Sequence, residues 1–252
     1  MRSFQAGVAA SLSGARPWRV EVVEQSGSTN AELVAKVRQG QAGEYAVLVA
    51  LDQPSGRGRK SRAWTMPPGE GVAISLVLPL GADSSRWGLV PLAVGVAVVR
   101  AVADLGVAAR LKWPNDVLVG TRKLCGILAE VADRSVVVGI GVNVLQTAET
   151  IFPTGVSLAL AGAGATREQV VAAVLNHVAD LWVGLAGDDG WGSLLADYRT
   201  VCGTLGQQVR VHTDEQTYVE GQAVDIADDG QLLVRTADRL NGFASGDVYH
   251  LR

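Results

Sequence analysis

The chain has 252 residues, of which 48% are hydrophobic and 19% charged, and its formal net charge at pH 7 is −3. This composition predicts a folded protein with a sizeable core and argues against a disordered chain. An acidic balance also disfavours a general nucleic-acid-binding protein, because such proteins are usually basic. The two cysteines, Cys125 and Cys202, form no Cys-x-x-Cys or Cys/His cluster, which disfavours a zinc site or a disulfide framework and fits a reducing cytosol.

The N-terminal part of the chain begins with residues 1–18, which we expect to be loosely ordered and too weakly apolar for a signal peptide. The next elements are predicted as strands at 20–23 and 45–51 and a helix at 30–38. Asn30 is the expected N-cap of that helix, and Gly40 is its stop signal. Residues 52–71 are rich in Gly, Pro and Arg and predict a long loop.

The middle of the chain predicts a sheet flanked by helices. Strands are expected at 72–78, 107–111, 116–119, 123–131 and 135–144, and helices at 87–105, 166–184 and 191–201. Thr166 and Gln169 have the spacing of a capping box at the start of one helix. The most apolar run, 88–99, ends at Arg100 and is too short to span a bilayer, so we interpret it as a buried helix and expect no membrane association.

After Gly203 the sequence changes in character. Its segments become short, alternating and rich in β-formers, with strands expected at 209–212, 218–226, 232–236 and 248–251. Asp228, Asp229 and Gly230 supply a tight turn. A stretch of this kind is typical of a small barrel. We therefore predict two domains, residues 1–202 and residues 203–252.

The strongest chemical feature is the run Gln-Pro-Ser-Gly-Arg-Gly-Arg-Lys-Ser-Arg-Ala-Trp from Gln53 to Trp64. Its arginines stay charged and present planar donor forks that match phosphate oxygens, and its glycines let the backbone approach a ligand. By itself the run is equally compatible with a solvated basic surface. It is not a Walker loop, because Arg59 stands where the glycine before Lys60 is required, and Gly139-Ile-Gly141 lacks the third glycine of a dinucleotide-binding fingerprint.

Two further motifs carry polar groups. Lys-Trp-Pro-Asn-Asp, residues 112–116, places a cation, an amide and a carboxylate at a strand end, although a hairpin turn is the simpler interpretation. Gly-Ser-Thr-Asn, residues 27–30, offers hydroxyls and an amide, most often a helix cap. The three histidines, His177, His212 and His250, have no context that supports a hydrolase triad.

Taken in order, these motifs and the later Lys-x-x-Gly-Ile-Leu-x-Glu and Gly-x-Gly-x-Asn sequences resemble the biotin–protein ligases. The match runs from about Gly27 to Val144, and the tail extends it. The resemblance implies an α+β (α/β) fold, with a mixed β-sheet and helices akin to class II aminoacyl-tRNA synthetases, followed by an SH3-like β-barrel. Only 26 residues precede the first motif, so we expect the short type without an N-terminal DNA-binding domain, and no DNA partner.

The resemblance also implies an activity. Biotin and Mg²⁺-ATP would give biotinyl-5′-AMP and pyrophosphate, and a lysine of a biotin carboxyl carrier domain would then take the biotin, all in the cytoplasm. Cations must offset the repulsion of two anions, so the expected catalytic residues are Lys112, Arg57 and Arg59. The expected biotin-binding residues are Ser28, Thr29, Asn30, Gln53, Gly56, Arg57, Lys112 and Gly126. The expected ATP-binding residues are Arg57, Gly58, Arg59, Arg62, Trp64, Asn115 and Asn143.

Several alternatives stay open at this point. A lipoate–protein ligase shares fold and chemistry, a nucleic-acid-binding module would use the basic loop, and a catalytically dead adenylate sensor would keep the site without the reaction. No dedicated protein metal site is expected, and the oligomer is either a monomer or a homodimer. Two residues depart from the family pattern: Ser61 replaces a frequent loop glycine, and Cys125 replaces a common alanine in what we expect to be the pocket wall.

Overall fold

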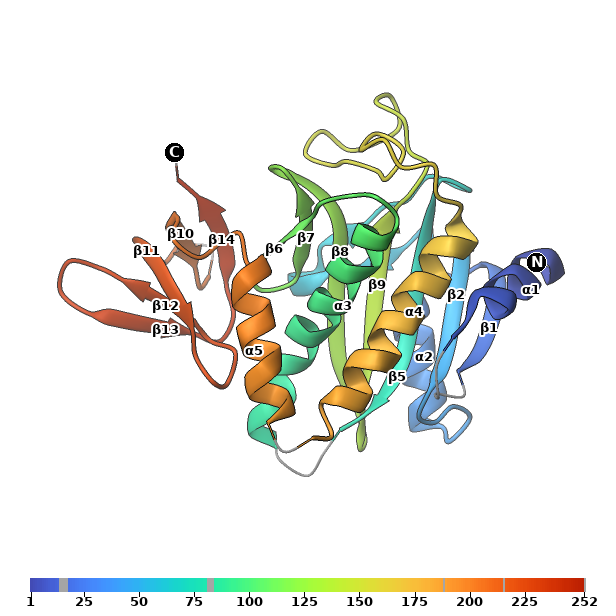
Figure 1. Ribbon diagram of the computed structural model, residues 1–252, viewed down its shortest axis with the longest axis horizontal. Helices are drawn as coiled ribbons and strands as arrows, with labels where there is room; N and C mark the ends of the chain where they lie inside the picture. The colour runs from blue at the N-terminus through green and yellow to red at the C-terminus, as the bar shows by residue number, and fades with distance from the viewer. Residues whose placement is uncertain (14–17, 81–83, 188, 215, 252) are drawn as a thin grey trace.

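The computed structural model describes residues 1–13, 18–80, 84–187, 189–214 and 216–251. Its larger part is built on a mixed seven-stranded sheet with the order β1-β2-β5-β9-β8-β7-β6 (Figure 1). The strands are Arg19–Gln25 (β1), Ala46–Asp52 (β2), Gly71–Pro79 (β5), Arg110–Lys112 (β6), Asp116–Val119 (β7), Arg122–Ala132 (β8) and Ser135–Asn143 (β9). β1 and β2 are parallel, and every other neighbouring pair in this sheet is antiparallel.

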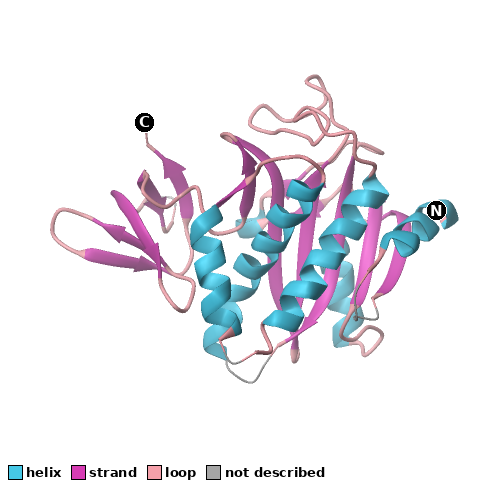
Figure 2. Ribbon diagram, viewed as in Figure 1, coloured by secondary structure: helices cyan, strands magenta, loops and turns pink. Residues whose placement is uncertain are grey.

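Helices cover both faces of this sheet, but unequally (Figure 2). On one face lie α1 (Arg2–Ser11), α3 (Val90–Asp104), α4 (Arg167–Gly184) and α5 (Gly190–Val201). Among the α-helices of the described residues, only α2 (Thr29–Arg38) packs on the opposite face, where Leu33 and Val34 meet Leu48 and Val137 in a small apolar cluster. The rest of that face is therefore left for the cavity described below.

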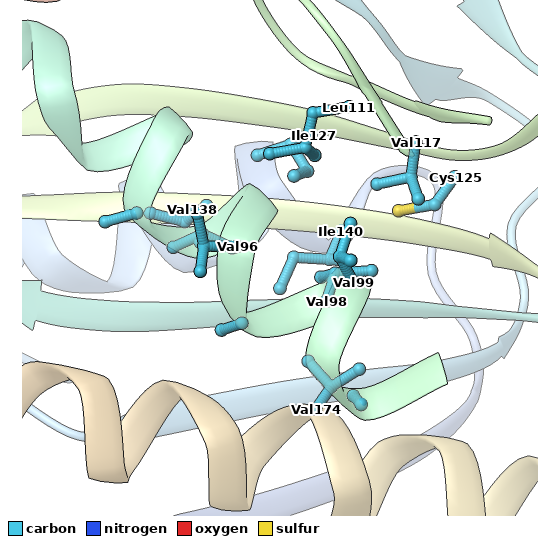
Figure 3. Close-up of a cluster of buried hydrophobic side chains, with 14 of the residues drawn as sticks. Val96, Val98, Val99, Leu111, Val117, Cys125, Ile127, Val138, Ile140 and Val174 are labelled. Carbon is cyan, nitrogen blue, oxygen red and sulfur yellow. The ribbon is translucent and has the colours of Figure 1, made fainter. Parts of the chain in front are cut away.

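The main core lies between the sheet and the helices of the crowded face. Figure 3 shows part of it, where Val96, Val98 and Val99 of α3 lie in one cluster with Ile127, Val138 and Ile140 of the sheet. Arg86–Asp104 is long and apolar enough to cross a membrane, but 67% of its most apolar stretch is buried inside the protein, as expected for the core helix of a globular domain.

The C-terminal part is a separate five-stranded antiparallel sheet with the order β13-β12-β11-β10-β14. Its strands are Gln208–His212 (β10), Tyr218–Ile226 (β11), Leu232–Arg235 (β12), Leu240–Phe243 (β13) and Asp247–His250 (β14). It is tied to the larger part by Arg199, which donates to Asp225 Oδ1 at 2.7 Å, and by Trp113, whose Nε1 donates to the Gly230 carbonyl at 3.0 Å. The two sheets share no strand in the described residues.

The predicted fold class, a mixed sheet with helices followed by a small β-rich unit, is confirmed. The capping box at Thr166 is also present, with both reciprocal hydrogen bonds. Three expectations were wrong in detail. Much of the expected loose start is the helix α1, which buries Phe4 and Val8; residues 14–17 lie outside the described residues. Ser28, not Asn30, caps α2, and the strand β13 was missed.

Candidate functional site

The floor of the candidate site is formed by small residues of β8 and β9. In β9, Val138 and Ile140 point into the main core, so the alternating Gly139 and Gly141 face the side of α2. A Cβ at Gly139 would lie 2.9 Å from Asn30 Oδ1, and one at Gly141 would lie 2.4 Å from the indole of Trp64. The absent side chains therefore open a cavity of about 140 Å³ against the sheet.

The arginine-rich run forms one wall of this cavity as a small hairpin. Its two short strands, β3 (Gly56–Arg57) and β4 (Ala63–Trp64), pair only with each other and are joined by the turn Arg59–Ser61. Lys60 at the tip has φ +53°, an uncommon value for a residue with a side chain. Trp64 seats the hairpin on the floor, next to Gly141, with Lys123 Nζ 5.6 Å from its ring centre. The expected long loop thus contains ordered structure, but no strand pairing ties it to the main sheet.

The C-terminal sheet holds the tip of the hairpin. Asp247 on β14 accepts from Lys60 Nζ at 3.2 Å and is also paired with Arg62. Arg59 donates to Asn115 Oδ1 at 3.3 Å and to the Gly246 carbonyl at 3.4 Å. Burial lowers the pKa of Arg59, although nearby carboxylates, Asp247 first, oppose that shift. The protein thus offers these cations acceptors similar to phosphate oxygens.

Polar groups cluster at the other end of the cavity, at the start of α2. Gln53 Oε1 accepts from the Thr29 backbone N–H at 2.9 Å and from the Thr29 hydroxyl at 3.2 Å. Ser75 donates in turn to Thr29 Oγ1 at 2.8 Å. Asn30 donates to Glu130, while its own Oδ1 is buried and has no hydrogen-bond partner among the described residues. A buried acceptor without a partner costs about 1–3 kcal/mol, so this end favours a ligand that brings N–H donors.

Two lysines lie near the site, and only one lines the cavity. Lys123 of β8 does so and pairs with Asp116 Oδ1 at 2.5 Å. The ammonium of Lys112 instead lies 5.9 Å from the centre of the Tyr249 ring in the C-terminal sheet. Burial, reinforced by repulsion from Lys123, lowers the pKa of Lys112 even though Asp116 partly compensates. The structure therefore does not bring Lys112 into the cavity where we expected a catalytic lysine.

Most of the predicted site residues do meet at this one cavity. Those that line it are Ser28, Thr29, Asn30, Gln53, Arg57, Gly58, Arg59, Arg62, Trp64, Asn115 and Gly126. Gly56 is buried behind Gln53, where a Cβ would lie 2.4 Å from Gln53 Nε2. Asn143 lines a neighbouring cavity instead. Arg57 is exposed, and no hydrogen bond or ion pair engages its guanidinium among the described residues, so it is free to meet a ligand.

Sequence reasoning missed several contributors to this cavity, Lys123, Gly139 and Gly141 among them. Lys123 stands in the Lys-x-x-Gly-Ile-Leu-x-Glu motif, which was recognised without giving its lysine a role. Gly139 and Gly141 were considered only as a failed dinucleotide fingerprint, although their alternation with Val138 and Ile140 marks one face of a strand. Cys125 is not a pocket-wall residue: it lies in the core (Figure 3), where burial raises the pKa of its thiol. The side chain of Ser61 lies outside the described residues.

The described residues contain no group of three or more His, Cys, Asp or Glu side chains placed to hold a metal ion. The two carboxylates that line the cavity, Asp116 and Asp247, are already paired with cations. Because protein cations already engage both carboxylates, a Mg²⁺ ion at this cavity would take most of its oxygen ligands from a bound ligand.

Comparison with protein families gives two matches. Residues 22–146 match the biotin/lipoate A/B protein ligase family, and residues 204–251 match the biotin protein ligase C terminal domain. Among named proteins, the chain is 38% identical over 241 residues to a biotin--[acetyl-CoA-carboxylase] ligase of Mycobacterium tuberculosis, an alignment that covers 93% of this chain and 90% of that protein. It is 29% identical to a bifunctional ligase/repressor of Bacillus spizizenii, covering 88% of this chain and 71% of that protein.

Solved structures of related fold were also found. A biotin protein ligase from Aquifex aeolicus in complex with biotin and ATP superposes with a TM-score of 0.79 at 25% identity, covering 92% of this chain and 98% of that chain. A biotin acetyl coenzyme A carboxylase synthetase from Helicobacter pylori, at 22% identity and a TM-score of 0.70, shares the fold over 88% of this chain and 98% of its own.

Proposed function

The chain belongs to the biotin/lipoate A/B protein ligase family, and from this premise we propose that it joins biotin to a carrier protein in two steps. Biotin and ATP first give biotinyl-5′-AMP and pyrophosphate, and a carrier lysine then displaces AMP. The observation that carries the proposal is one cavity with arginine and lysine side chains on one wall and, at its other end, a buried acceptor that has no hydrogen-bond partner among the described residues.

The polar end of the cavity suits the ring system of biotin. A ureido group has two N–H donors and one carbonyl acceptor. Asn30 Oδ1 is a buried acceptor without a donor among the described residues, and Ser28 and Thr29, which carry hydroxyls, line the same cavity. The floor of Gly139 and Gly141 leaves room for the rest of the acid along the sheet.

The cationic wall suits the reaction itself. A carboxylate and an α-phosphate repel each other, so charge stabilisation is the main requirement of the first step. We assign that role to Lys123, which is held at the cavity by Asp116, and to Arg57 and Arg59 of the hairpin. This moves the catalytic lysine from Lys112, our expectation from the sequence, to Lys123. Both steps proceed without a covalent enzyme intermediate, so positioning and electrostatics suffice.

The second step needs a protein partner. We propose the biotin carboxyl carrier domain of a biotin-dependent carboxylase, because the Mycobacterium tuberculosis relative is named for acetyl-CoA carboxylase. The attacking amine forms an amide bond with the biotin carboxyl carbon, and AMP leaves with the electrons of the cleaved anhydride bond.

We further propose that Mg²⁺ enters with ATP and that the reaction takes place in the cytoplasm. We also propose that residues 1–202 form the catalytic domain and residues 203–252 the C-terminal domain.

Exchange of labelled pyrophosphate into ATP tests the first step. The protein is assayed with biotin, lipoate and octanoate in parallel. Exchange that depends on biotin supports the proposal, and exchange that depends on lipoate or octanoate assigns the chain to the lipoate branch of the family. Absence of exchange with all three acids would contradict the proposed enzyme activity, and the protein would then be an adenylate sensor or a binding module.

A further inference from the structure

Glu130 is the last residue of the Lys-x-x-Gly-Ile-Leu-x-Glu motif, and the proposed reaction gives it no role. Side chains of a strand alternate between the two faces of a sheet, so Gly126, Leu128, Glu130 and Ala132 of β8 share the face of α2. Gly126 and Leu128 line the candidate cavity, whereas Ala132 is buried in the apolar cluster beneath α2. Glu130 therefore lies between the cavity and that cluster, where its carboxylate reaches Asn30 in the first turn of α2.

The contact with Glu130 fixes the direction of the Asn30 side-chain amide. Asn30 is only 4% exposed, and its Nδ2 donates to Glu130 Oε2. Since an ionised carboxylate accepts hydrogen bonds but donates none, the amide nitrogen must face Glu130 and the amide oxygen must face away from it. That oxygen is buried without a hydrogen-bond partner among the described residues. It lies beside Gly139, where a Cβ would be only 2.9 Å away, and both residues line the cavity.

We propose that Glu130 is a positioning residue for the acid: it holds the Asn30 amide so that Oδ1 accepts from one ring N–H of the ureido group of biotin. The inference rests on the proposed function. An amide that is not held can turn by half a rotation and set its own N–H groups against that ring N–H. Glu130 thus makes Asn30 a dedicated acceptor, which selects a ring with a donor at this place over a ring with an acceptor there.

A purely structural role for Glu130 would have different consequences. A carboxylate near the first turn of a helix stabilises it through the helix dipole, and α2 already has Glu32 there, bonded to Ser26 and Lys36. Loss of a structural carboxylate lowers the stability of the protein and the affinity for every acid alike. Loss of a positioning carboxylate instead changes the preference between two acids that differ only in the ring N–H.

A first experiment needs no variant. Titration calorimetry compares biotin with its two cyclic carbamate analogues, in each of which an oxygen atom replaces one ring N–H. We expect at least one analogue to bind about tenfold or more weakly than biotin, because it loses a hydrogen bond to a buried acceptor and places an oxygen against that acceptor. Equal affinities for biotin and both analogues overturn the inference.

A second experiment assigns this preference to Glu130. In Glu130→Lys an ammonium, which only donates, turns the Asn30 amide round, so the preference for biotin over the analogue should fall to about one or below. Glu130→Gln still offers an oxygen to Asn30 Nδ2 and should keep most of the preference. Glu32→Lys makes the same charge change in the first turn of α2, and as the matched control it should leave the preference at the unmodified value. A preference that survives in Glu130→Lys overturns the inference.

A rescue separates positioning from folding. When Asn30→Asp is added to Glu130→Lys, the new carboxylate accepts from the new ammonium with one oxygen and presents the other to the cavity, so the preference for biotin should return. A double variant that melts like the unmodified protein without regaining the preference overturns the inference. Loss of biotin-dependent pyrophosphate exchange with an intact preference for biotin contradicts the proposed function alone, and absence of biotin binding to the unmodified protein overturns both.

Discussion

The floor and the cationic wall of the cavity are built in opposite ways. Gly126, Gly139 and Gly141 belong to long strands that are hydrogen-bonded on both sides, over a core of fully buried side chains. The hairpin from Gly56 to Trp64 pairs only with itself and is held by side chains, some of them reaching the C-terminal sheet. The floor, which fits the shape of a ligand, is therefore already formed in the folded protein. The cations that we expect to bind phosphate lie instead on a hairpin that can move.

The largest expected effect separates two lysines. Lys123→Met removes the cation that the floor presents to the cavity, so kcat/KM for biotin-dependent pyrophosphate exchange should fall by about 10²–10³. The matched change Lys112→Met, in a lysine that faces Tyr249, should cost less than about tenfold. A larger loss in the Lys112 variant would return the catalytic role to that residue.

A second prediction concerns the preformed floor. Gly141→Ala places a methyl group on the position occupied by the Trp64 indole, so overpacking should cost about 1–3 kcal/mol of unfolding free energy and displace the hairpin. We expect retention of the adenylate to fall about tenfold or more. Gly184→Ala, at an exposed helical glycine with no atom within 4 Å of the new methyl group, is the control: it should stabilise the protein slightly, by up to about 1 kcal/mol, and leave retention of the adenylate unchanged. If Gly141→Ala retained the adenylate as well as the unmodified protein does, close packing of Trp64 on Gly141 would not be needed for retention.

A third prediction concerns the hold of the C-terminal sheet on the hairpin. Asp247→Asn removes the charge that pairs with Lys60 and Arg62, so bound biotinyl-5′-AMP should dissociate several-fold faster, as measured by its release from a preformed complex. Asp225→Asn removes a carboxylate of the same sheet that pairs with Arg199, and is the control. Equal release rates in both variants would mean that the hairpin closes without help from Asp247.

The smallest expected effect is a pH dependence of stability, which arises at the contact between the two sheets. His250 Nε2 lies 3.2 Å from Thr204 Oγ1, and that hydroxyl also accepts a hydrogen bond from the backbone N–H of Trp113. Burial, with repulsion from Lys112, lowers the pKa of His250 from its usual 6.5. The unfolded chain therefore takes up the proton at a higher pH than the folded protein does, so stability should fall as pH drops through 6.5 toward the lower pKa of the folded protein.

Thermal unfolding across this range measures the effect. The melting temperature of the unmodified protein should decrease slightly on acidification, and His250→Gln, which keeps an acceptor but does not titrate, should lose that part of the decrease. An unchanged pH profile in the variant would assign the dependence to other groups.

Much of the fold was predictable because its elements have strong local signals. The strand β9 is a run of β-branched residues, and α4 begins with the capping box of Thr166 and Gln169. The helix α1 was missed because only Phe4 and Val8 are buried, so its stability depends on packing against the rest of the chain. The strand β13 was missed because it contains Asn241 and Gly242, residues typical of turns.

Which residues line the candidate cavity was largely predictable from the sequence, but how they are arranged around it was not. Ser28, Gln53 and Gly126, which were named from the ordered motifs, line one cavity. Which lysine enters that cavity depends on strand register, and β7 and β8 contain an irregularity between Val117 and Leu118. The pairing of Lys60 with Asp247 joins positions 187 residues apart, and no local pattern contains such a contact. Contacts between residues far apart in the chain could therefore not be predicted from local sequence patterns.

Hydrogen exchange measured peptide by peptide tests the central contrast most directly. The protein is compared alone and with biotin plus Mg²⁺-ATP, and the amides of 56–64 are followed beside those of 136–143. We expect the strand amides to be protected in both states and the hairpin amides to gain strong protection only with both ligands. Full protection of the hairpin without ligands, or exchange of the strand that changes as much as that of the hairpin, would contradict a preformed floor with a ligand-closed wall.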